Sequence, residues 1–238
     1  MITVVSRPDS LILDPARTVV VVIDMQNDFG APGGMFDRAG IDISGIAGAA
    51  AATSRLLAAA RDARLPIVYV TMGHPPDLAN AGSKDGPHWI KHLPLHVGED
   101  VVAPDGSQSR ILVKDTWNTR ILDELEPRPG DTIVSKHRFS GFFETELHDV
   151  LRGLNASCLV VAGCTTSICV ESTVRDAMFR DYTCLVLEDC TAEPLGSEHV
   201  RTNHEASLLN IEALFGWVSD SGALIDSLTR DAILVATP

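Results

Sequence analysis

Short runs of aliphatic residues alternate along the chain with longer segments in which apolar positions recur at a helical period. Six of the runs are predicted strands, at 18–24, 66–71, 131–136, 157–163, 182–187 and 216–219. The segments between them predict helices at 44–63, 145–154, 166–180, 197–214 and 223–228, with a short helix or turn at 121–125. Strand and helix alternate throughout, which predicts an α/β fold with a parallel sheet and helices on both faces. No linker or repeat divides residues 1–238, so we expect one domain.

The segment from 73 to 109 follows neither period. Its prolines and histidines are Pro75, Pro76, Pro87, Pro94, Pro104, His74, His88, His92 and His96. A long irregular segment inside a compact domain usually has a functional role. Histidines can ligate metals, but no acid stands at a spacing that completes a recognisable site, so we expect no bound metal.

Composition limits the partners that this chain can have. The 238 residues carry a formal net charge of −13 and contain no run of Lys or Arg. Nucleic acids and anionic membranes both attract basic surfaces, so we expect neither as a partner. No apolar stretch approaches the roughly 20 residues that span a bilayer, and the N-terminus lacks the apolar region of a signal peptide. We therefore expect a cytoplasmic protein, in which an odd number of five cysteines indicates free thiols.

Three residues with charged or reactive side chains follow predicted central strands: Asp24, Lys136 and Cys169. The carboxyl ends of parallel strands share one edge, where open α/β sheets bind their ligands. Cys169 falls in the first turn of the predicted helix 166–180, and a helix N-terminus stabilises negative charge. A thiol, an acid that accepts its proton and a lysine that stabilises the thiolate form a nucleophilic site. We therefore expect Cys169 to have a depressed pKa.

The same positions also fit roles without catalysis. A cysteine at a strand–helix turn is often a small buried apolar residue, and Cys164 and Cys169 could instead be redox-sensing thiols. Cys158 and Cys184 lie within predicted strands, so we expect them in the core. Asp24 follows five consecutive aliphatic residues, where an unpaired acid is costly to bury. A partner is therefore expected for this carboxylate.

Three motifs stand in order along the chain. They are Asp24-Met25-Gln26-Asn27-Asp28-Phe29, Lys136-His137-Arg138-Phe139-Ser140-Gly141-Phe142 and the segment from Gly163 to Thr173. Together they resemble the motifs of the isochorismatase-like cysteine hydrolases. The resemblance implies a Rossmann-like three-layer fold with a six-stranded parallel sheet and a catalytic triad of Asp24, Lys136 and Cys169. It also implies a non-proline cis peptide at Cys164–Thr165, with the backbone N–H groups of Thr165 and Cys169 as the oxyanion hole.

The resemblance further implies a type of reaction. True isochorismatases, which cleave a vinyl ether, typically lack the cysteine, so a chain with Cys169 resembles an amidase that forms a covalent acyl-enzyme. Asp24 would take the thiol proton, pass it to the leaving nitrogen and then activate water. Vinyl-ether hydrolysis stays open as the less favoured alternative. The metal motif of the nicotinamidase branch is absent after the second strand, so neither a metal nor another cofactor is expected.

Within this family the chain is most similar to the ureidoacrylate amidohydrolases, and its loop after the second strand resembles that of the biuret hydrolases. Both branches act on ureido or carbamoyl groups. The implied reaction is hydrolysis of a small, ureidoacrylate-like amide or ureide, with release of ammonia or carbamate. The ureidoacrylate enzymes tend to carry Asn and Trp where this chain has Met72 and His74. We therefore expect a substrate that differs from ureidoacrylate itself.

Loops beside the three motifs are expected to form the substrate pocket. The candidate residues are Phe29, His74, His88, Trp89, Lys91, Trp117 and Phe139. The resemblance also implies a homo-oligomer, a dimer or a tetramer, in which a partner chain could close the pocket. The other expected partner is the small-molecule amide or ureide that the enzyme hydrolyses.

Overall fold

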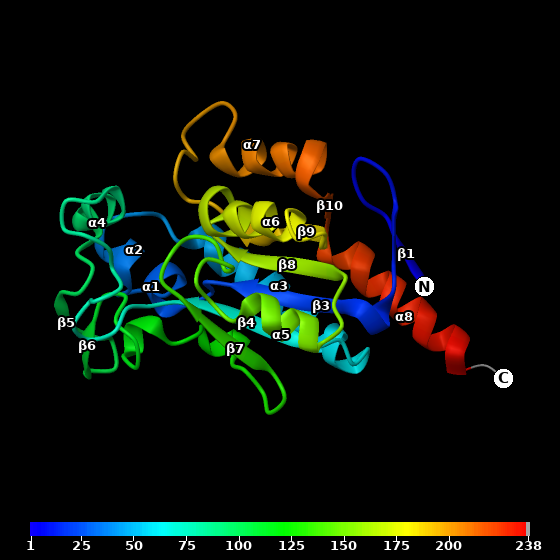
Figure 1. The fold of residues 1–238 in the computed structure, drawn as a ribbon, viewed down its shortest axis with the longest axis horizontal. Coiled ribbons are helices and arrows are strands. Elements are labelled where there is room, and N and C mark those ends of the chain that lie inside the picture. The colour runs from blue at the N-terminus through cyan, green and yellow to red at the C-terminus, as the bar shows by residue number, and fades with distance from the viewer. Residues whose placement is uncertain (237–238) are drawn as a thin grey trace.

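A six-stranded parallel sheet forms the centre of the computed structural model, which describes residues 1–236 and the side chains of residues 1–230 (Figure 1). Its strands are β3 (Thr18–Ile23), β4 (Ile67–Met72), β7 (Thr132–Lys136), β8 (Cys158–Cys164), β9 (Thr183–Ala192) and β10 (Trp217–Ser219). Their order across the sheet is β10-β9-β8-β3-β4-β7, and every neighbouring pair is parallel. The predicted α/β fold and six-stranded parallel sheet are therefore confirmed.

Helices cover both faces of this sheet (Figure 1). The longer ones are α3 (Ser44–Asp62), α5 (Leu147–Gly153), α6 (Glu171–Met178), α7 (Asn203–Asn210) and α8 (Ser221–Ala236). Strand β3 shows how the sequence produces the layers, because successive side chains of a strand point to opposite faces. Val20 and Val22 join the core beneath α3 and α8, whereas Val19 and Val21 join the core beneath α5, α6 and α7. Burial on both faces explains why β3 is apolar from Val19 to Ile23.

Shorter elements connect and flank these layers. They are β1 (Ile2–Val4), β2 (Leu11–Leu13), β5 (Asp100–Val102), β6 (Gln108–Arg110), α1 (Asn27–Gly30), α2 (Met35–Arg38) and α4 (Pro87–His92). Single 3-10 turns occur at Pro15–Arg17, Leu93–Leu95, Trp117–Thr119 and Asp123–Leu125, and π-helical turns at Thr166–Val170 and Ile211–Phe215. Strands β1 and β2 form an antiparallel pair, as do β5 and β6.

Several predicted boundaries are corrected. Segment 73–109 is not irregular throughout, because α4 and β5 form within it. The helix predicted at 197–214 begins only at Asn203, where Thr202 caps it through a reciprocal pair of hydrogen bonds with Glu205. Strand β9 continues past the predicted end at 187, because a shift in its register with β8 lets the pairing resume at Thr191.

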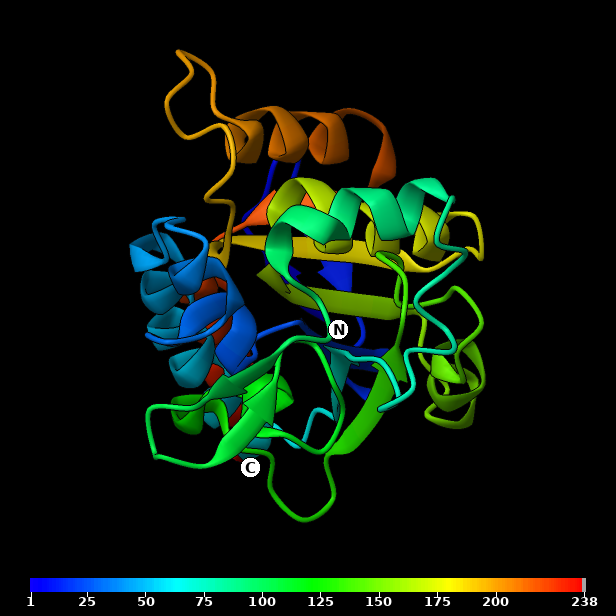
Figure 2. The same cartoon turned by 90° about the vertical axis from the view of Figure 1, so that its left-hand side faces the viewer.

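The carboxyl ends of the sheet strands open at the end of the molecule where α1, α2 and α4 lie. This end is on the left in Figure 1 and faces the viewer in Figure 2. Strands β3 and β8 are central neighbours, and the chain continues from them to opposite sides of the sheet, to β4 and to β9. Open α/β sheets bind ligands at such a switch point. Within residues 1–236, no helix has both the length and the apolar character needed to cross a bilayer.

Candidate active site

Strand β3 delivers Asp24 to the carboxyl edge of the sheet. The residue adopts a left-handed backbone with φ of 52°. Its N–H donates to the carbonyl of Val70 at 2.8 Å, and its own carbonyl accepts from the N–H of Gln26 at 2.8 Å. The carboxylate is fully buried. The end of the strand therefore fixes an acidic group in the interior, at the centre of the ligand-binding edge.

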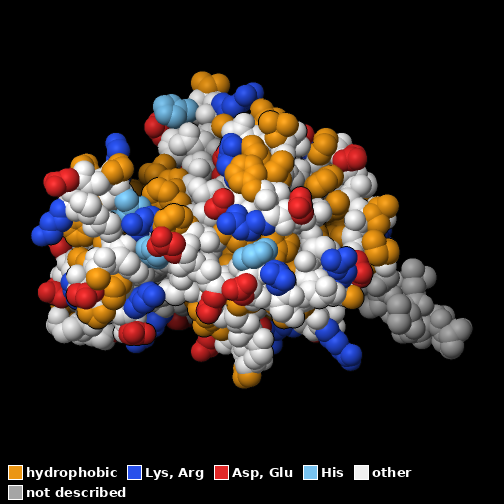
Figure 3. Space-filling model, in the orientation of Figure 1, with side chains coloured by type: hydrophobic (Ala, Val, Ile, Leu, Met, Phe, Trp, Pro, Cys, Tyr) orange, Lys and Arg blue, Asp and Glu red, His pale blue; other side chains and the backbone are white. Residues whose placement is uncertain are grey.

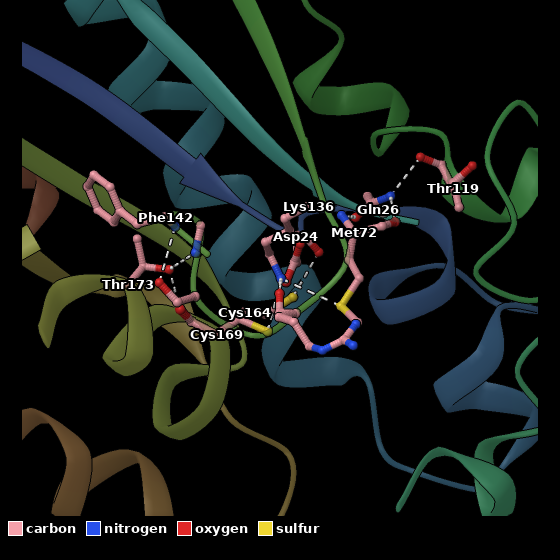
Figure 4. A network of polar contacts seen from close by, with 12 residues as sticks. Asp24, Gln26, Met72, Thr119, Lys136, Phe142, Cys164, Cys169 and Thr173 are labelled. Atoms are coloured by element: carbon pink, nitrogen blue, oxygen red, sulfur yellow. Dashed lines mark hydrogen bonds and ion pairs between the residues drawn. The ribbon is translucent and has the colours of Figure 1, made fainter. Parts of the chain in front are cut away.

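Lys136 reaches the same point from the end of β7, which pairs with β4 and lies two strands away from β3. Its Nζ lies 2.7 Å from Oδ2 of Asp24 and 3.3 Å from Sγ of Cys169. The ammonium also donates to the carbonyl of Arg138 at 3.1 Å. Figure 4 shows Asp24, Lys136 and Cys169 converging from three separate elements. The structure thus brings together all three residues of the expected triad.

Burial dominates the ionisation of these three groups. It raises the pKa of Asp24, although the Lys136 ammonium opposes the shift. Burial also raises the pKa of the Cys169 thiol, and the charge of Asp24 raises it further. Burial by itself would lower the pKa of Lys136, but Asp24 and Cys169 together keep it above its ordinary value. The resting site therefore holds a protonated thiol beside the Asp24–Lys136 pair.

The expected depressed pKa of Cys169 is accordingly wrong for the substrate-free enzyme. Lys136 and the helix N-terminus both favour the thiolate. The loss of water around the sulfur and the negative charge of Asp24 together outweigh them. Neither oxygen of Asp24 accepts a hydrogen bond of regular geometry from any described residue. The carboxylate therefore has lone pairs available for a proton from the neighbouring thiol.

The turn that carries the nucleophile depends on Gly163. This glycine has φ of 138°, and a Cβ at its position would lie 2.2 Å from the carbonyl oxygen of Ile23. A larger residue would push β8 away from β3, the strand that ends at Asp24. The next peptide bond, Cys164–Thr165, is cis, as the sequence resemblance implied. Cys169 follows in the π-helical turn that leads into α6.

Hydrogen bonds tie this turn to the segments around it. The hydroxyl of Thr173 donates to the Cys169 carbonyl at 2.7 Å and accepts from the N–H of Gly141 at 2.9 Å (Figure 4). The buried carboxylate of Glu193 accepts from the N–H of Ser167 at 3.0 Å and from its hydroxyl at 2.5 Å. These bonds hold the backbone on both sides of the nucleophile.

The other four cysteines differ from Cys169 in their surroundings. All five are free and buried. Cys158 and Cys184 belong to the two halves of the core, as expected. The thiol of Cys164 donates to the carbonyl of Asp24 at 3.1 Å, and burial raises its pKa well above the ordinary value. Cys164 therefore supports the backbone of the site, whereas Cys169 lines a cavity.

A cavity of about 320 Å³ lies over the Cys169 sulfur. Among the residues expected to bind substrate, Phe29, Lys91 and Phe139 line it. Met72, a position singled out in the sequence, lines it as well. Further lining residues that sequence reasoning missed include Met35, Phe36, Leu112 and Leu195. The sequence signal that could have found them is a large apolar side chain in a turn-rich segment, because such a side chain needs an apolar surface to pack against.

Four of the expected pocket residues do not line the cavity. They are His74, His88, Trp89 and Trp117. His74 is fully buried beneath the loop, with Nδ1 2.8 Å from Oδ1 of Asn80. Residues 87–92 form the helix α4, so their side chains point in different directions and cannot all face the nucleophile. Lys91 and His92 line the cavity, whereas Trp89 lines a separate hollow together with Leu93 and Val97.

The histidines of this region form a stack against Phe139. The rings of His88 and His92 lie 4.2 Å apart, and both contact the Phe139 ring. Burial lowers the pKa of His74 and of His88 to about 4 in each case, and lowers that of His92. These rings are therefore uncharged at neutral pH. Across the described side chains, no three His, Cys, Asp or Glu residues form a group that could hold a metal ion.

Comparison with known proteins identifies the family. The isochorismatase domain model matches residues 18–223. Ureidoacrylate amidohydrolase RutB of Methylobacterium radiotolerans is 40% identical over 223 residues, which cover 94% of this chain and 84% of the relative. RutB of Agrobacterium fabrum is 41% identical over 217 residues, or 91% of this chain and 92% of the relative. A cysteine hydrolase from Pseudomonas syringae pv. phaseolicola 1448A shares the fold with a TM-score of 0.75 and 27% identity, covering 92% and 95% of the two chains.

The chain belongs to the isochorismatase family. The match spans the whole sheet and all three motifs, which confirms the resemblance seen in the sequence. Within that family, the similarity to the amidohydrolases identifies the protein as a C–N hydrolase.

Proposed function

We propose that this protein hydrolyses a C–N bond of a small amide or ureide through covalent catalysis by Cys169. The observation that carries the proposal is the contact of Lys136 Nζ with both Asp24 Oδ2, at 2.7 Å, and Cys169 Sγ, at 3.3 Å, where Cys169 lines a cavity. The name of the RutB relatives, ureidoacrylate amidohydrolase, supports ureides and amides as the substrate class. Biuret and N-carbamoyl compounds belong to the same class.

Acylation begins with transfer of the thiol proton to Asp24 as the sulfur attacks the substrate carbonyl. The raised pKa values of both groups suit this order, because the thiolate then forms only at the moment of attack. The backbone N–H groups of Thr165 and Cys169 stabilise the oxyanion. In the described chain, the Thr165 N–H donates to no other group, which leaves it free for this role. Asp24 then protonates the leaving nitrogen as the C–N bond breaks.

Deacylation reverses the roles of the same groups. Water attacks the thioester, Asp24 accepts a proton from that water, and the proton returns to the sulfur as the C–S bond breaks. Lys136 stays charged through both half-reactions. Its ammonium limits the cost of a buried carboxylate and orients the sulfur, to which it is hydrogen-bonded. Each turnover thus consumes one water and restores the neutral thiol.

Ammonia release tests the proposal, with ureidoacrylate, biuret, an N-carbamoyl amino acid and maleamate as substrates. We expect wild type to release ammonia from at least one of them and Cys169→Ala to lose roughly 10⁴-fold or more of that rate. Cys184→Ala is the matched control, because it removes another buried thiol far from the cavity and should keep the activity. Mass spectrometry after rapid acid quenching should detect an acyl group on Cys169. Turnover that survives in folded Cys169→Ala would exclude the covalent mechanism.

A further inference from the structure

The cavity over Cys169 is apolar beyond the reacting atoms. Its polar lining residues are Lys91, His92, Thr165 and Cys169 itself, and all the others are aliphatic, aromatic or Met. In Figure 3, apolar side chains gather in a recess at the left-hand end of the molecule, where the sheet strands end. The space beyond the scissile bond is therefore bounded mainly by hydrocarbon.

Met72 contributes a fixed part of this apolar wall. The side-chain amide of Gln26 brackets its backbone, accepting from the Met72 N–H at 2.7 Å and donating to the Met72 carbonyl at 3.0 Å (Figure 4). Its sulfur lies 3.6 Å from Lys136 Nζ, so the side chain packs directly against the triad. The wall is therefore held in place by the same network that supports the catalytic groups.

The cations near the cavity are already engaged or lie in solvent. Lys136 is paired with Asp24 at 2.7 Å. The Arg138 guanidinium donates to the carbonyls of Asn80 and His137 at 2.7 and 2.8 Å. Nδ1 of His92 lies 2.7 Å from the carbonyl of His88, and the ring is uncharged at neutral pH. Lys91 is exposed to water. An anionic group inside the cavity and away from Lys91 would lose its hydration with no unpaired cation beside it.

We infer that the substrate carries an uncharged, apolar group next to its amide or ureide, rather than a carboxylate. This inference rests on the proposed function and narrows its substrate class. Each methylene that enters the cavity should raise kcat/KM about four-fold. A volume of about 320 Å³ is at the lower end for small-molecule sites, so the apolar group is small. Ureidoacrylate carries a carboxylate, so this enzyme should differ in preference from the substrate named for its RutB relatives.

Two pairs of substrates isolate the charge, because isopropyl and carboxylate groups have similar shapes. Succinamate is compared with 4-methylpentanamide, and N-carbamoyl-β-alanine with N-(3-methylbutyl)urea. We expect kcat/KM for the neutral member of the productive pair to exceed that of the acid at least roughly 100-fold. Equal rates, or a preference for the acid, would overturn the inference and leave the proposed function intact. No ammonia from any of the four compounds, or from ureidoacrylate, would instead count against the proposed function.

Two variants test whether the apolar lining sets this preference. Leu195→Arg places a cation on the cavity wall and should shift the ratio of neutral to acidic kcat/KM at least ten-fold toward the acid. Leu214→Arg is the control, because Leu214 is 73% exposed and lies outside the cavity lining. Lys91→Gln removes a cation from the lining, so the ratio of neutral to acidic kcat/KM should stay in favour of the neutral substrate. An acid preference in wild type that disappears in Lys91→Gln would show that Lys91 anchors a carboxylate, which is the opposite outcome.

Discussion

Two buried carboxylates lie four residues apart after β3, and the protein treats them in opposite ways. Asp28 accepts hydrogen bonds from the N–H of Met35 at 3.0 Å, from the N–H of Leu112 at 2.6 Å and from the side-chain amide of Asn118. Asp24 accepts no regular hydrogen bond from the described residues and instead lies 2.7 Å from the Lys136 ammonium. One acid accepts three hydrogen bonds from structural groups, whereas the other faces the ammonium and the thiol of the site.

This contrast separates a structural acid from a reactive one. The donors to Asp28 come from segments that also line the cavity, since both Met35 and Leu112 contribute to its wall. Asp28 therefore holds the cavity wall together, and its oxygens are occupied by donors rather than facing the thiol. Asp24 instead lies beside the thiol. Burial by itself is common to both, so the pattern of partners, rather than burial, distinguishes the two functions.

The largest effect is expected when the reactive acid is changed. Asp24→Asn keeps the shape of the side chain but removes the proton acceptor, so kcat/KM should fall roughly 10³-fold or more while the protein still folds. Ammonia release gives the rate, and circular dichroism checks the fold. Asp28→Asn, assayed beside it at 20 °C, should stay within about ten-fold of wild type. Retained activity in Asp24→Asn would show that Asp24 is not the reactive acid of the pair.

The pH dependence of thiol alkylation gives this substitution a second readout. Because burial and Asp24 both raise the pKa of Cys169, iodoacetamide should react with wild type with a midpoint above the free-thiol value of about 8.5. Asp24→Asn removes the negative charge and keeps Lys136, so the midpoint should move down. A midpoint that stays unchanged would mean that Asp24 does not act on the sulfur.

Changing the structural acid should affect stability instead. The donors to Asp28 bind two carboxylate oxygens, but the Asp28→Asn side chain offers only one oxygen. Its new NH₂ group would face an N–H donor instead of accepting from it. Leaving such groups unpaired in the interior should lower the free energy of unfolding by about 2–4 kcal/mol. Urea denaturation at pH 7 measures this, with Asp37→Asn near the surface as the control. A loss below about 0.5 kcal/mol would show that the three hydrogen bonds contribute little.

The sequence predicts much of this site because the relevant signals are local. An acid after five aliphatic residues, as at Asp24, requires a buried partner. The alternation of strands and helices predicts a parallel sheet, whose carboxyl edge then brings Lys136 and Cys169 to the same place. Burial of a strand on both faces is likewise visible in its unbroken apolar run, so the strands other than β9 could be predicted with limits within about one residue.

The cavity wall could not be predicted in the same way. Its residues come from α2, from the segments near Leu112 and Leu195 and from α4, and they meet only because long-range contacts such as the Asp28 hydrogen bonds join these segments. No local period places Leu112 opposite Met35. The orientation of α4 was equally hidden, because six residues are too few to show a helical period. The sequence therefore does not separate His88 and Trp89, which lie outside the cavity lining, from Lys91, which belongs to it.

The pH dependence of stability should distinguish the two acids further. Burial raises the pKa of Asp28 to about 6, above its unfolded value of about 3.9. Between these values the folded chain binds the proton more tightly, so this group adds stability below pH 4 and the contribution is lost as the pH rises through 6. The difference in unfolding free energy between wild type and Asp28→Asn should therefore grow by about 2 kcal/mol from pH 7 to pH 4.5. A constant difference would mean that Asp28 titrates alike in both states.

The smallest expected effect concerns Thr173. Its hydroxyl has hydrogen-bond partners, as the Asp28 carboxylate has, but one of them is the backbone of the nucleophile. Thr173→Val keeps the volume and removes the bonds to the Cys169 carbonyl and to the Gly141 N–H. The turn that holds the sulfur should loosen, so kcat should fall about ten-fold with little change in KM, because substrate contacts are not removed. Thr173→Ser, which retains the hydroxyl, should restore most of the rate. Thr229→Val is the matched control, because the Thr229 hydroxyl also donates to a carbonyl four residues earlier, on the distant helix α8. A fall in KM and kcat alike, or no rescue by Thr173→Ser, would show that the hydrogen bonds of the Thr173 hydroxyl do not set the geometry of the nucleophile.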